Sequence, residues 1–494
     1  MPINIKSLIV IVLLASIGFA FCKKLTYPAI SAIEFKRWRN IWFLIVISAF
    51  TASNFWLFIL FAGILITAVT KQENNMALFF ILVFALPSIE KDILGFGIVN
   101  YLFTLDYIRF LELVILLPVA LDALRKRRFS FLSIWTDKFI LIYMILIVAL
   151  DLRATSVTDT LRTALYTTFE IFLPYYVASR SIDNLHKMRT VLYAFLTSAI
   201  VITFISTFES VKHWLVYNTL PSALDANFNL GKYLGRGSGI RAIASLGHPI
   251  VLGCFITVAI GFYLYLFNNI ENKTLKRIGA LILTIGLLTP MSRGPWIAAA
   301  LLIIIFIWQG PGAFKKLSQL FVGAIVAFSF LAMTSSGQNF INLLPIVGKT
   351  EQYNIDYREQ LFHNSFVVIA KSPIFGSVDY LKTPEMQTLI QGQGIIDVVN
   401  TYIGITLERG YAGLILFLSI FISVIMVIRK SMKSIIDKKD QLHLLGRSLV
   451  AILLSIMFMI STTSSIASLP IIYWSILGLG IAYTRIVKLA VSTL

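Results

Sequence analysis

The sequence is poor in charged residues, and this shortage excludes a soluble globular protein. Only 13% of its 494 residues are Asp, Glu, Lys or Arg, whereas 58% are hydrophobic. A soluble globular chain carries about 25% charged residues. Cysteine is also scarce, because Cys22 and Cys254 are the two present and both lie in apolar runs. We therefore expect neither a disulfide framework nor a cysteine-ligated metal site.

Motifs for nucleotides and metals are missing as well. The sequence has no glycine-rich phosphate loop with a lysine, no HExxH, no CxxC and no dinucleotide fingerprint. It also has no acidic cluster of the kind that holds a divalent cation. We therefore expect no cofactor and no metal ion. The net charge is +18, but the basic residues lie in short loops between apolar runs, which is typical of membrane topology rather than of nucleic-acid binding.

Long apolar runs, by contrast, recur along the whole sequence. Each is long enough to cross roughly 30 Å of hydrocarbon as a helix, and in lipid a helix pairs all of its own backbone groups. We predict an all-α, polytopic transmembrane bundle of about 13–15 spans, with residues 1–494 forming a single integral membrane domain. The spans are expected near 7–22, 40–53, 55–70, 76–89, 105–124, 133–150, 161–179, 190–211, 247–268, 278–290, 295–309, 319–335, 400–428, 447–462 and 468–485.

Two details at the start of the chain need interpretation. The apolar segments on either side of residues 51–54 form either one broken helix or two separate helices. The first apolar run is followed by Lys23 and Lys24 and lacks a small-residue cleavage site. We therefore interpret this run as a retained span and not as a signal peptide.

Basic residues gather in four clusters, which predict the orientation. The clusters are Lys23, Lys24, Lys36, Arg37 and Arg39; residues 125–128; Lys273, Lys276 and Arg277; and Arg429, Lys430, Lys433, Lys438 and Lys439. The positive-inside rule places these clusters on the cytoplasmic side. The long loops 210–246 and 336–399 then lie on the opposite side.

The longer loop contains an amphipathic stretch over residues 354–370. Its apolar residues recur at helical spacing and include Ile355, Leu361, Phe362, Phe366 and Ile369. This spacing predicts a helix that lies along the membrane–water boundary.

Ionisable residues on the non-cytoplasmic side are the candidates for chemistry, because such residues are costly near a membrane. Four groups stand out: Arg236, Arg241 and His248 before a span; Arg293 in a tight turn; Tyr357 and Arg358 on the amphipathic helix; and Asp397 and Asn400 at the mouth of a span, with Glu408 and Arg409 deeper in it. We expect Glu408 and Arg409 to pair or to face the bundle interior.

Simpler interpretations of these arginines exist. Arg236 and Arg241 could be interfacial residues of a flexible loop, Arg293 could cap helix ends, and Arg358 could extend to lipid headgroups. Guanidinium groups, however, bind phosphate bidentately and stay charged. Several of them on one face suit a diphosphate, and they could replace a metal ion in stabilising a diphosphate leaving group.

The chain resembles the O-antigen polymerase and ligase superfamily of bacterial membrane glycosyltransferases. Four patches carry the resemblance: GIRAIASLGHPIVLG at 239–253, MSRGPW at 291–296, YREQLFHNSFVVIAKSPIFG at 357–376 and NTYIGITLERGYAGL at 400–414. The order of the patches, their spacing and the large loop before the last patch all agree with that superfamily.

The resemblance implies a GT-C-like helical fold in the bacterial inner membrane, with an active site that faces the periplasm. Loops 210–246 and 336–399 would then be periplasmic. The substrates would be glycan repeat units on undecaprenyl diphosphate, as donor and as acceptor, and transfer would be inverting and metal-independent. The family-type arginines correspond to Arg241, Arg293 and Arg358. Membrane lipids, a chain-length regulator and export proteins are expected partners, and nucleic acid is not.

One departure from the family pattern bears on the function. Ligases of the superfamily often carry His-Asn where this chain has Val399-Asn400, with Asp397 two residues before Val399. This form is more similar to the exopolysaccharide polymerases. If transfer needs a general base, Asp397 is the first candidate and His248 the second. Arg236, Tyr357, Asn400 and Arg409 are expected to bind substrate.

The sequence therefore predicts a polymerase that joins lipid-linked oligosaccharide units. Two alternatives remain open at this point. One is a ligase that moves a finished glycan to another acceptor, and the other is a transporter or flippase for the same lipid-linked glycan. A transporter typically has paired halves and charged residues at mid-membrane depth, and neither is clear in this sequence.

Overall fold

The computed structural model describes the chain except for a few short segments. These are residues 1, 28, 70–73, 98, 127–131, 154–155, 229–230, 237–238, 335–336, 339–340, 342–351, 392–393 and 493–494. Residues 127 and 128 of the second basic cluster and residues 342–351 of the longer loop therefore lie outside the described residues.

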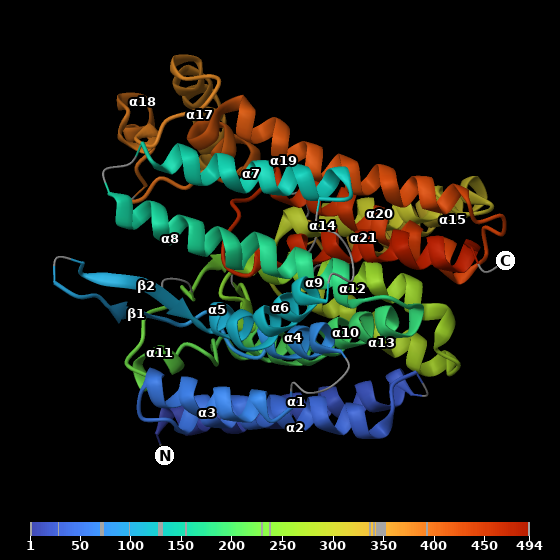
Figure 1. The fold of residues 1–494 in the computed structure, drawn as a ribbon. Helices are drawn as coiled ribbons and strands as arrows, with labels where there is room; N and C mark the ends of the chain where they lie inside the picture. The colour runs from blue at the N-terminus through green and yellow to red at the C-terminus, as the bar shows by residue number, and fades with distance from the viewer. Residues whose placement is uncertain are drawn as a thin grey trace.

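Three helices form a layer along one side of the molecule (Figure 1). They are α1 (Ile3–Thr26), α2 (Ala32–Thr51) and α3 (Phe55–Thr67). The Asn54 side chain caps α3 by accepting the N–H of Leu57 at 3.0 Å, and such a cap satisfies a donor that the helix itself leaves unpaired. Two separate helices therefore meet around residues 51–54.

Four largely buried helices form the centre of the bundle. They are α10 (Leu185–Lys212), α12 (Pro249–Leu266), α20 (Gln441–Ile460) and α21 (Leu469–Ser492). Around them pack the short α4 (Asn75–Val83), then α13 (Lys273–Leu288) and α14 (Arg293–Trp308). The helix α15 (Ala313–Ala332) contacts α14 at the edge of the bundle, and none of its residues is buried.

The opposite side of the bundle holds α7 (Trp135–Asp151) against the long α19 (Thr401–Lys433). Two helical segments beside them contain a π-helical turn. One comprises α5 (Tyr107–Leu111), η1 (Glu112–Leu116) and α6 (Leu117–Arg125), and the other α8 (Val157–Thr167), η2 (Thr168–Phe172) and α9 (Leu173–Ser181).

The remaining elements are short. A hairpin of β1 (Glu90–Leu94) and β2 (Tyr101–Asp106) precedes α5, and β3 (Gly235–Arg236) pairs with β4 (Gly239–Ile240). Single helical turns occur at α11 (Leu220–Ala223), η3 (Ala244–Leu246), η4 (Phe267–Asn269), η5 (Tyr380–Lys382) and α18 (Pro384–Gln387).

The predicted all-α membrane fold is confirmed. Within the described residues, seven helices are long and apolar enough to cross a membrane: α1, α10, α12 with η4, α15, α19, α20 and α21. Every predicted span overlaps a helix, and shorter apolar helices such as α3 and α14 account for others. The α4 helix has nine residues, about 14 Å at 1.5 Å per residue, which is too short to cross alone. The total number of crossings stays a prediction.

The molecule has two distinct ends (Figure 1). The β1–β2 hairpin, α11, α18 and the helix α17 (Gln352–Lys371) lie at one end, which we call the hairpin end. The C-terminus and the turn between α19 and α20 lie at the other, which we call the basic end. There, one cavity is lined by Lys23, Lys24 and Arg39 together with Asn272 and Leu275, so the first and third basic clusters lie together.

The predicted amphipathic helix is present as α17, but its apolar residues do not form one face. Leu361 and Ile369 are buried with residues of α18 and α19. Ile355, Phe362 and Phe366 are exposed instead, and the two phenylalanine rings pack edge to face at 4.6 Å. Tertiary packing buries two of these five apolar residues. The prediction that all five share one membrane-facing surface is therefore wrong.

Candidate active site

The turn between α13 and α14, at the hairpin end, carries Arg293 and is held by two other arginines. Arg241 donates from Nε to the carbonyl oxygen of Pro290 at 3.1 Å and from Nη2 to Ser292 Oγ at 2.7 Å. Arg236 donates from Nη1 to another carbonyl of the same turn at 2.5 Å. Three of the predicted arginines therefore meet at this turn.

A buried carboxylate fixes the segment that follows Arg241. Glu209 of α10 is fully buried and accepts the backbone N–H groups of Val216, Ile243 and Ala244 at 3.1, 3.1 and 2.7 Å. A charge-assisted hydrogen bond to a backbone N–H is among the stronger ones in proteins. Glu209 thus anchors the loop before α12 and, with it, the position of Arg241.

His248 caps the N-terminus of α12. Its Nδ1 accepts the N–H of Ile250 at 3.3 Å. Burial, with a further contribution from the charge of Arg241, lowers the pKa of the His248 imidazole to about 4. The imidazole is therefore neutral at neutral pH, and its Nδ1 is occupied by the hydrogen bond that caps the helix.

Tyr357 and Arg358 attach α17 to the rest of the hairpin end. The Tyr357 hydroxyl donates to the carbonyl oxygen of Asp397 at 2.9 Å and accepts that residue's N–H at 3.0 Å. Arg358 donates from Nη2 to the carbonyl oxygen of Thr462 at 3.3 Å. Both predicted residues therefore contact segments far away in the sequence.

The loop at 461–468, between α20 and α21, joins these pieces, and we call it the hydroxyl loop. Ser464 Oγ donates to Asp397 Oδ1 at 2.8 Å. Thr401, the first residue of α19, donates its N–H to the carbonyl oxygen of Thr463 at 3.0 Å. Thr462 also lies against Gly294, where a Cβ would come within 2.9 Å of its Oγ1. The loop thus contacts the Arg293 turn, Arg358 and Asp397.

The mouth of α19 is shaped by a cap and a break. Asn400 caps the helix by accepting the N–H groups of Tyr402 and Ile403 at 2.9 and 3.1 Å. Further along, Gly410 has φ +64° and ψ −170°, a conformation that is essentially restricted to glycine.

Segment 373–377 supplies the backbone partners that this break needs. The N–H of Tyr411 bonds the carbonyl oxygen of Pro373 at 2.8 Å, and the N–H of Ser377 bonds that of Leu407 at 2.9 Å. This contact explains why SPIFG and LERGYAG occur together. It also positions Arg409, which pairs with Glu408 at 3.3 Å, as expected, and donates to the Tyr143 hydroxyl at 3.3 Å.

A cavity of about 510 Å³ opens beside the hydroxyl loop. Asp397, Asn400 and Arg409 line it together with Ser464 and Ser465. Five aromatic side chains, which offer flat apolar faces to sugar rings, are also part of the lining: Tyr143, Tyr166, Tyr380, Tyr473 and Trp474. We call it the central cavity. Polar groups that converge among aromatic and aliphatic side chains are typical of a small-molecule site.

Residues 278–418 match the family model described as O-antigen ligase. The matched segment makes up less than a third of the chain. No curated protein matches the chain. The resemblance to the O-antigen polymerase and ligase superfamily is thereby confirmed, and the apolar helices indicate a multi-pass membrane protein.

The O-antigen ligase segment covers part of the site. It begins in α13 and includes Arg293, Arg358, Asp397, Asn400 and Arg409, together with Tyr357. The other arginines of the turn precede it and reach it through their hydrogen bonds to residues 290–292. The candidate site is therefore built from the matched segment and from loops on both sides of it.

The predicted residues fall into two sets within the site. Asp397, Asn400 and Arg409 line the central cavity, whereas Arg236, Arg241, Arg293 and Arg358 lie beside Thr462 and the turn at 290–293. No group of three or more His, Cys, Asp and Glu side chains that could hold a metal ion occurs in the described part of the chain.

Sequence reasoning missed the hydroxyl loop and a group of acids near it. The run TTSSIAS between two apolar spans was a visible turn signal. Glu112 and Glu170, both of which line a second cavity beside the loop, lie inside apolar runs. The cost of a charge within a span marks such residues as candidates, but neither lies in one of the four patches that carry the family resemblance.

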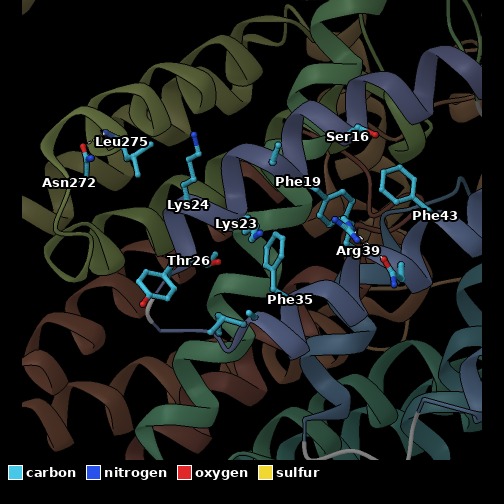
Figure 2. A pocket seen from close by; sticks show the side chains of 15 residues that line it. Ser16, Phe19, Lys23, Lys24, Thr26, Phe35, Arg39, Phe43, Asn272 and Leu275 are labelled. Carbon is cyan, nitrogen blue, oxygen red and sulfur yellow. Dashed lines mark hydrogen bonds between the residues drawn. The ribbon is translucent and has the colours of Figure 1, made fainter.

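A larger cavity than these lies elsewhere. It measures about 1020 Å³ and lies at the basic end between α1, α2 and α13 (Figure 2), where Lys23, Lys24 and Arg39 surround the rings of Phe19 and Phe35. None of the predicted catalytic residues lines it. Size alone therefore does not identify the active site of this enzyme.

Proposed function

We propose that the chain is a polymerase that joins undecaprenyl-diphosphate-linked repeat units into an exopolysaccharide or another surface polysaccharide. The observation that carries the proposal is the hydroxyl loop, which contacts both the arginine-bearing segments and Asp397. A cationic group suited to a diphosphate thus adjoins a cavity suited to sugars. The proposal places this site at the periplasmic face of the bacterial inner membrane, with loops 210–246 and 336–399 on that side.

The transfer step requires few groups. The acceptor hydroxyl oxygen forms a bond to C1 of the donor sugar from the face opposite the diphosphate, so the configuration inverts. The bond between C1 and the diphosphate oxygen breaks, and undecaprenyl diphosphate leaves with the electron pair. The hydroxyl proton passes to the Asp397 carboxylate, which is exposed at the cavity. Because a diphosphate leaves without protonation, the site needs positive charge more than it needs an acid.

Arg241, Arg293 and Arg358 supply that positive charge in this proposal. Guanidinium groups bind phosphate oxygens in pairs and cannot lose their charge at any relevant pH. Preorganised charge at the leaving group lowers the barrier because it stabilises the transition state more than the ground state. The proposed transfer is therefore independent of a divalent metal ion.

A ligase remains the second candidate, because the matching family model is described as O-antigen ligase. Against it stands Val399 before Asn400, at a position where ligases often have histidine. His248 does not replace that residue readily, since its Nδ1 accepts the Ile250 N–H.

The length of the lipid-linked glycan in cells that lack the chain tests the proposal. Without a polymerase, single repeat units accumulate on the lipid carrier. Without a ligase, long chains accumulate on the carrier instead. A third result, single units that stay at the cytoplasmic face, would show that the chain moves the glycan and forms no bond.

A further inference from the structure

A second polar cavity, of about 240 Å³, lies beside the hydroxyl loop. Glu90, Asp106, Arg109, Glu112 and Glu170 line it, so we call it the acid cavity. It shares Glu170, Ser465 and Pro470 with the central cavity. Because one side chain of the hydroxyl loop lies on both walls, a ligand could extend from one cavity into the other.

Two π-helical turns bring glutamates to this place. In η1 the N–H of Leu117 bonds the carbonyl oxygen of Glu112, and in η2 the N–H of Leu173 bonds that of Thr168. A proline follows each of these leucines, at Pro118 and Pro174. Proline lacks an N–H and collides with the carbonyl four residues back, so the helix widens to the i→i−5 pattern at that point. Such turns occur often at functional sites.

Arg109 is the positive group of the acid cavity, and both of its terminal nitrogens are already in use. It pairs with Asp106 at 3.4 Å and with Glu170 at 3.0 Å, and it donates to the carbonyl oxygen of Thr104 at 3.0 Å. Its guanidinium also stacks on the Tyr166 ring at 4.0 Å. These contacts fix Arg109 in place and direct it toward groups other than Glu112.

Glu112 is the unexplained group. Its side chain is fully buried, and neither carboxylate oxygen has a hydrogen-bond partner among the residues that the structure describes. Burying a carboxylate without partners is costly, so such a group in a native protein needs an explanation. Because Glu112 lines the acid cavity, its partners must be hydrogen-bond donors that enter the cavity.

We propose that the acid cavity binds the hydroxyl groups of the acceptor sugar, with Glu112 as a hydrogen-bond acceptor. The oxygens of a carboxyl group accept hydrogen bonds, and a sugar ring is a dense source of hydroxyl donors. The cavity is far larger than the roughly 15 Å³ that one water needs. Its carboxylates outnumber its one arginine, so it repels the diphosphate that the arginine turn attracts.

This assignment rests on the proposed function, because it presumes a glycan acceptor. It divides the site by charge: donor diphosphate at the arginines, transfer beside Asp397, and acceptor hydroxyls at the acid cavity. Glu112 is thus a binding residue for the acceptor, and the step that forms the bond does not consume its charge.

The test uses the purified full-length protein in lipid nanodiscs. The donor is the lipid-linked glycan isolated from cells that lack the chain, and the acceptor is the same repeat unit freed from its carrier. Glu112→Gln keeps the shape of the side chain and replaces one acceptor oxygen with an NH2 donor. We expect the KM for the free acceptor to rise by about tenfold, which corresponds to the loss of one hydrogen bond, while the KM for the donor stays unchanged.

Asp122→Asn is the matched control. Asp122 lies on the same helical segment, is exposed and pairs with Lys126 at 2.8 Å, so its removal should leave both KM values unchanged. An acceptor KM for Glu112→Gln that equals the control overturns the proposal. So does an equal rise in both KM values, because that result reports a distorted site.

A second measurement needs no variant. A hydrophobic carbodiimide modifies buried carboxyl groups, and mass spectrometry reports the extent at Glu112 in the wild-type protein. The free repeat unit should protect Glu112, and inorganic diphosphate should not. Absence of protection by the glycan refutes the acceptor site. If the glycan protects Glu112 but the wild type forms no polymer, the binding site stands and the polymerase assignment fails.

Discussion

The two ends of the bundle both carry positive charge, but different side chains supply it in different settings. At the hairpin end the cations are arginines whose guanidinium groups hold backbone carbonyls and hydroxyls of the site. At the basic end Lys23 and Lys24 are exposed, and Arg39 donates to the neighbouring Asn40 at 3.0 Å. The first group is fixed by contacts between distant segments, and the second lies on the surface of single helices.

In the proposed function, this difference separates a diphosphate site from a topology signal. A lysine on a flexible stem contributes charge to a loop wherever it points, which is sufficient for orientation in a membrane. An arginine held by several hydrogen bonds presents its remaining donors in one direction, which is necessary for recognising a diphosphate. Equal charge at the two ends therefore corresponds to different functions.

Removing a guanidinium from the hairpin end should have the largest effect. For Arg358→Ala we expect transfer to slow by about 10²–10³, equivalent to about 3–4 kcal/mol of lost transition-state stabilisation. Arg358→Lys should recover only part of this, because lysine keeps the charge but not the planar fork. Polymer formation at matched membrane levels measures both variants.

Arg37→Ala at the basic end is the control for these variants. It removes the same side chain from a cluster that lies away from the site, so polymer formation should continue. If Arg358→Ala still forms full-length polymer, the assignment of Arg358 to the site is wrong. Wild-type activity of Arg358→Lys would reduce its role to a point charge or a lipid anchor.

An intermediate effect is expected at the break in α19, which holds the hairpin end together. A Cβ at Gly410 would lie 2.2 Å from the carbonyl oxygen of Ile374, and the backbone conformation alone disfavours alanine by about 1–3 kcal/mol. Gly410→Ala should lower the thermal unfolding temperature and weaken polymer formation. In the same helix Gly404→Ala meets its nearest atom only at 3.8 Å and should behave like the wild type. Equal stability of the two variants would contradict the strained geometry.

The smallest effect is expected at the basic end itself. Replacing Lys23 and Lys24 by glutamine removes two charges from exposed positions, where substitutions change free energies by about 0.5 kcal/mol or less. The rest of the cluster, with Lys36, Arg37 and Arg39, still marks the cytoplasmic side. Transfer rates should stay within about twofold of wild type. If the transfer rate falls as far as in Arg358→Ala, positive charge does not have different roles at the two ends.

The helices were predictable because their cause is local. An apolar run of sufficient length has no other way to pair its backbone in lipid, so each predicted span overlaps a helix. The residues of α17 show where such local reasoning stops. Spacing alone placed Leu361 and Phe362 on one surface, but packing buries the first and leaves the second exposed.

The site was predictable residue by residue but not as an arrangement. The arginines and Asp397 followed from charge near a membrane and from the family resemblance. Their meeting point is the hydroxyl loop, whose Thr462 and Ser464 contact them from the other end of the sequence. Hydrogen bonds between distant segments leave no periodic pattern in a sequence. Glu112 was not predicted for a different reason, because it lies outside the four patches that carry the family resemblance.

The break in α19 also determines the order in which the site is completed. Synthesis proceeds from the N-terminus, so Pro373 and its neighbours exist before Tyr411 needs them as partners. The backbone partners that the break requires are therefore present as soon as α19 has been made. The first residue of α19, Thr401, must instead wait for Thr463. When synthesis has reached α20, the chain already contains the broken helix and the segments that carry Arg241, Arg293 and Arg358. The site is complete only after the hydroxyl loop has been made.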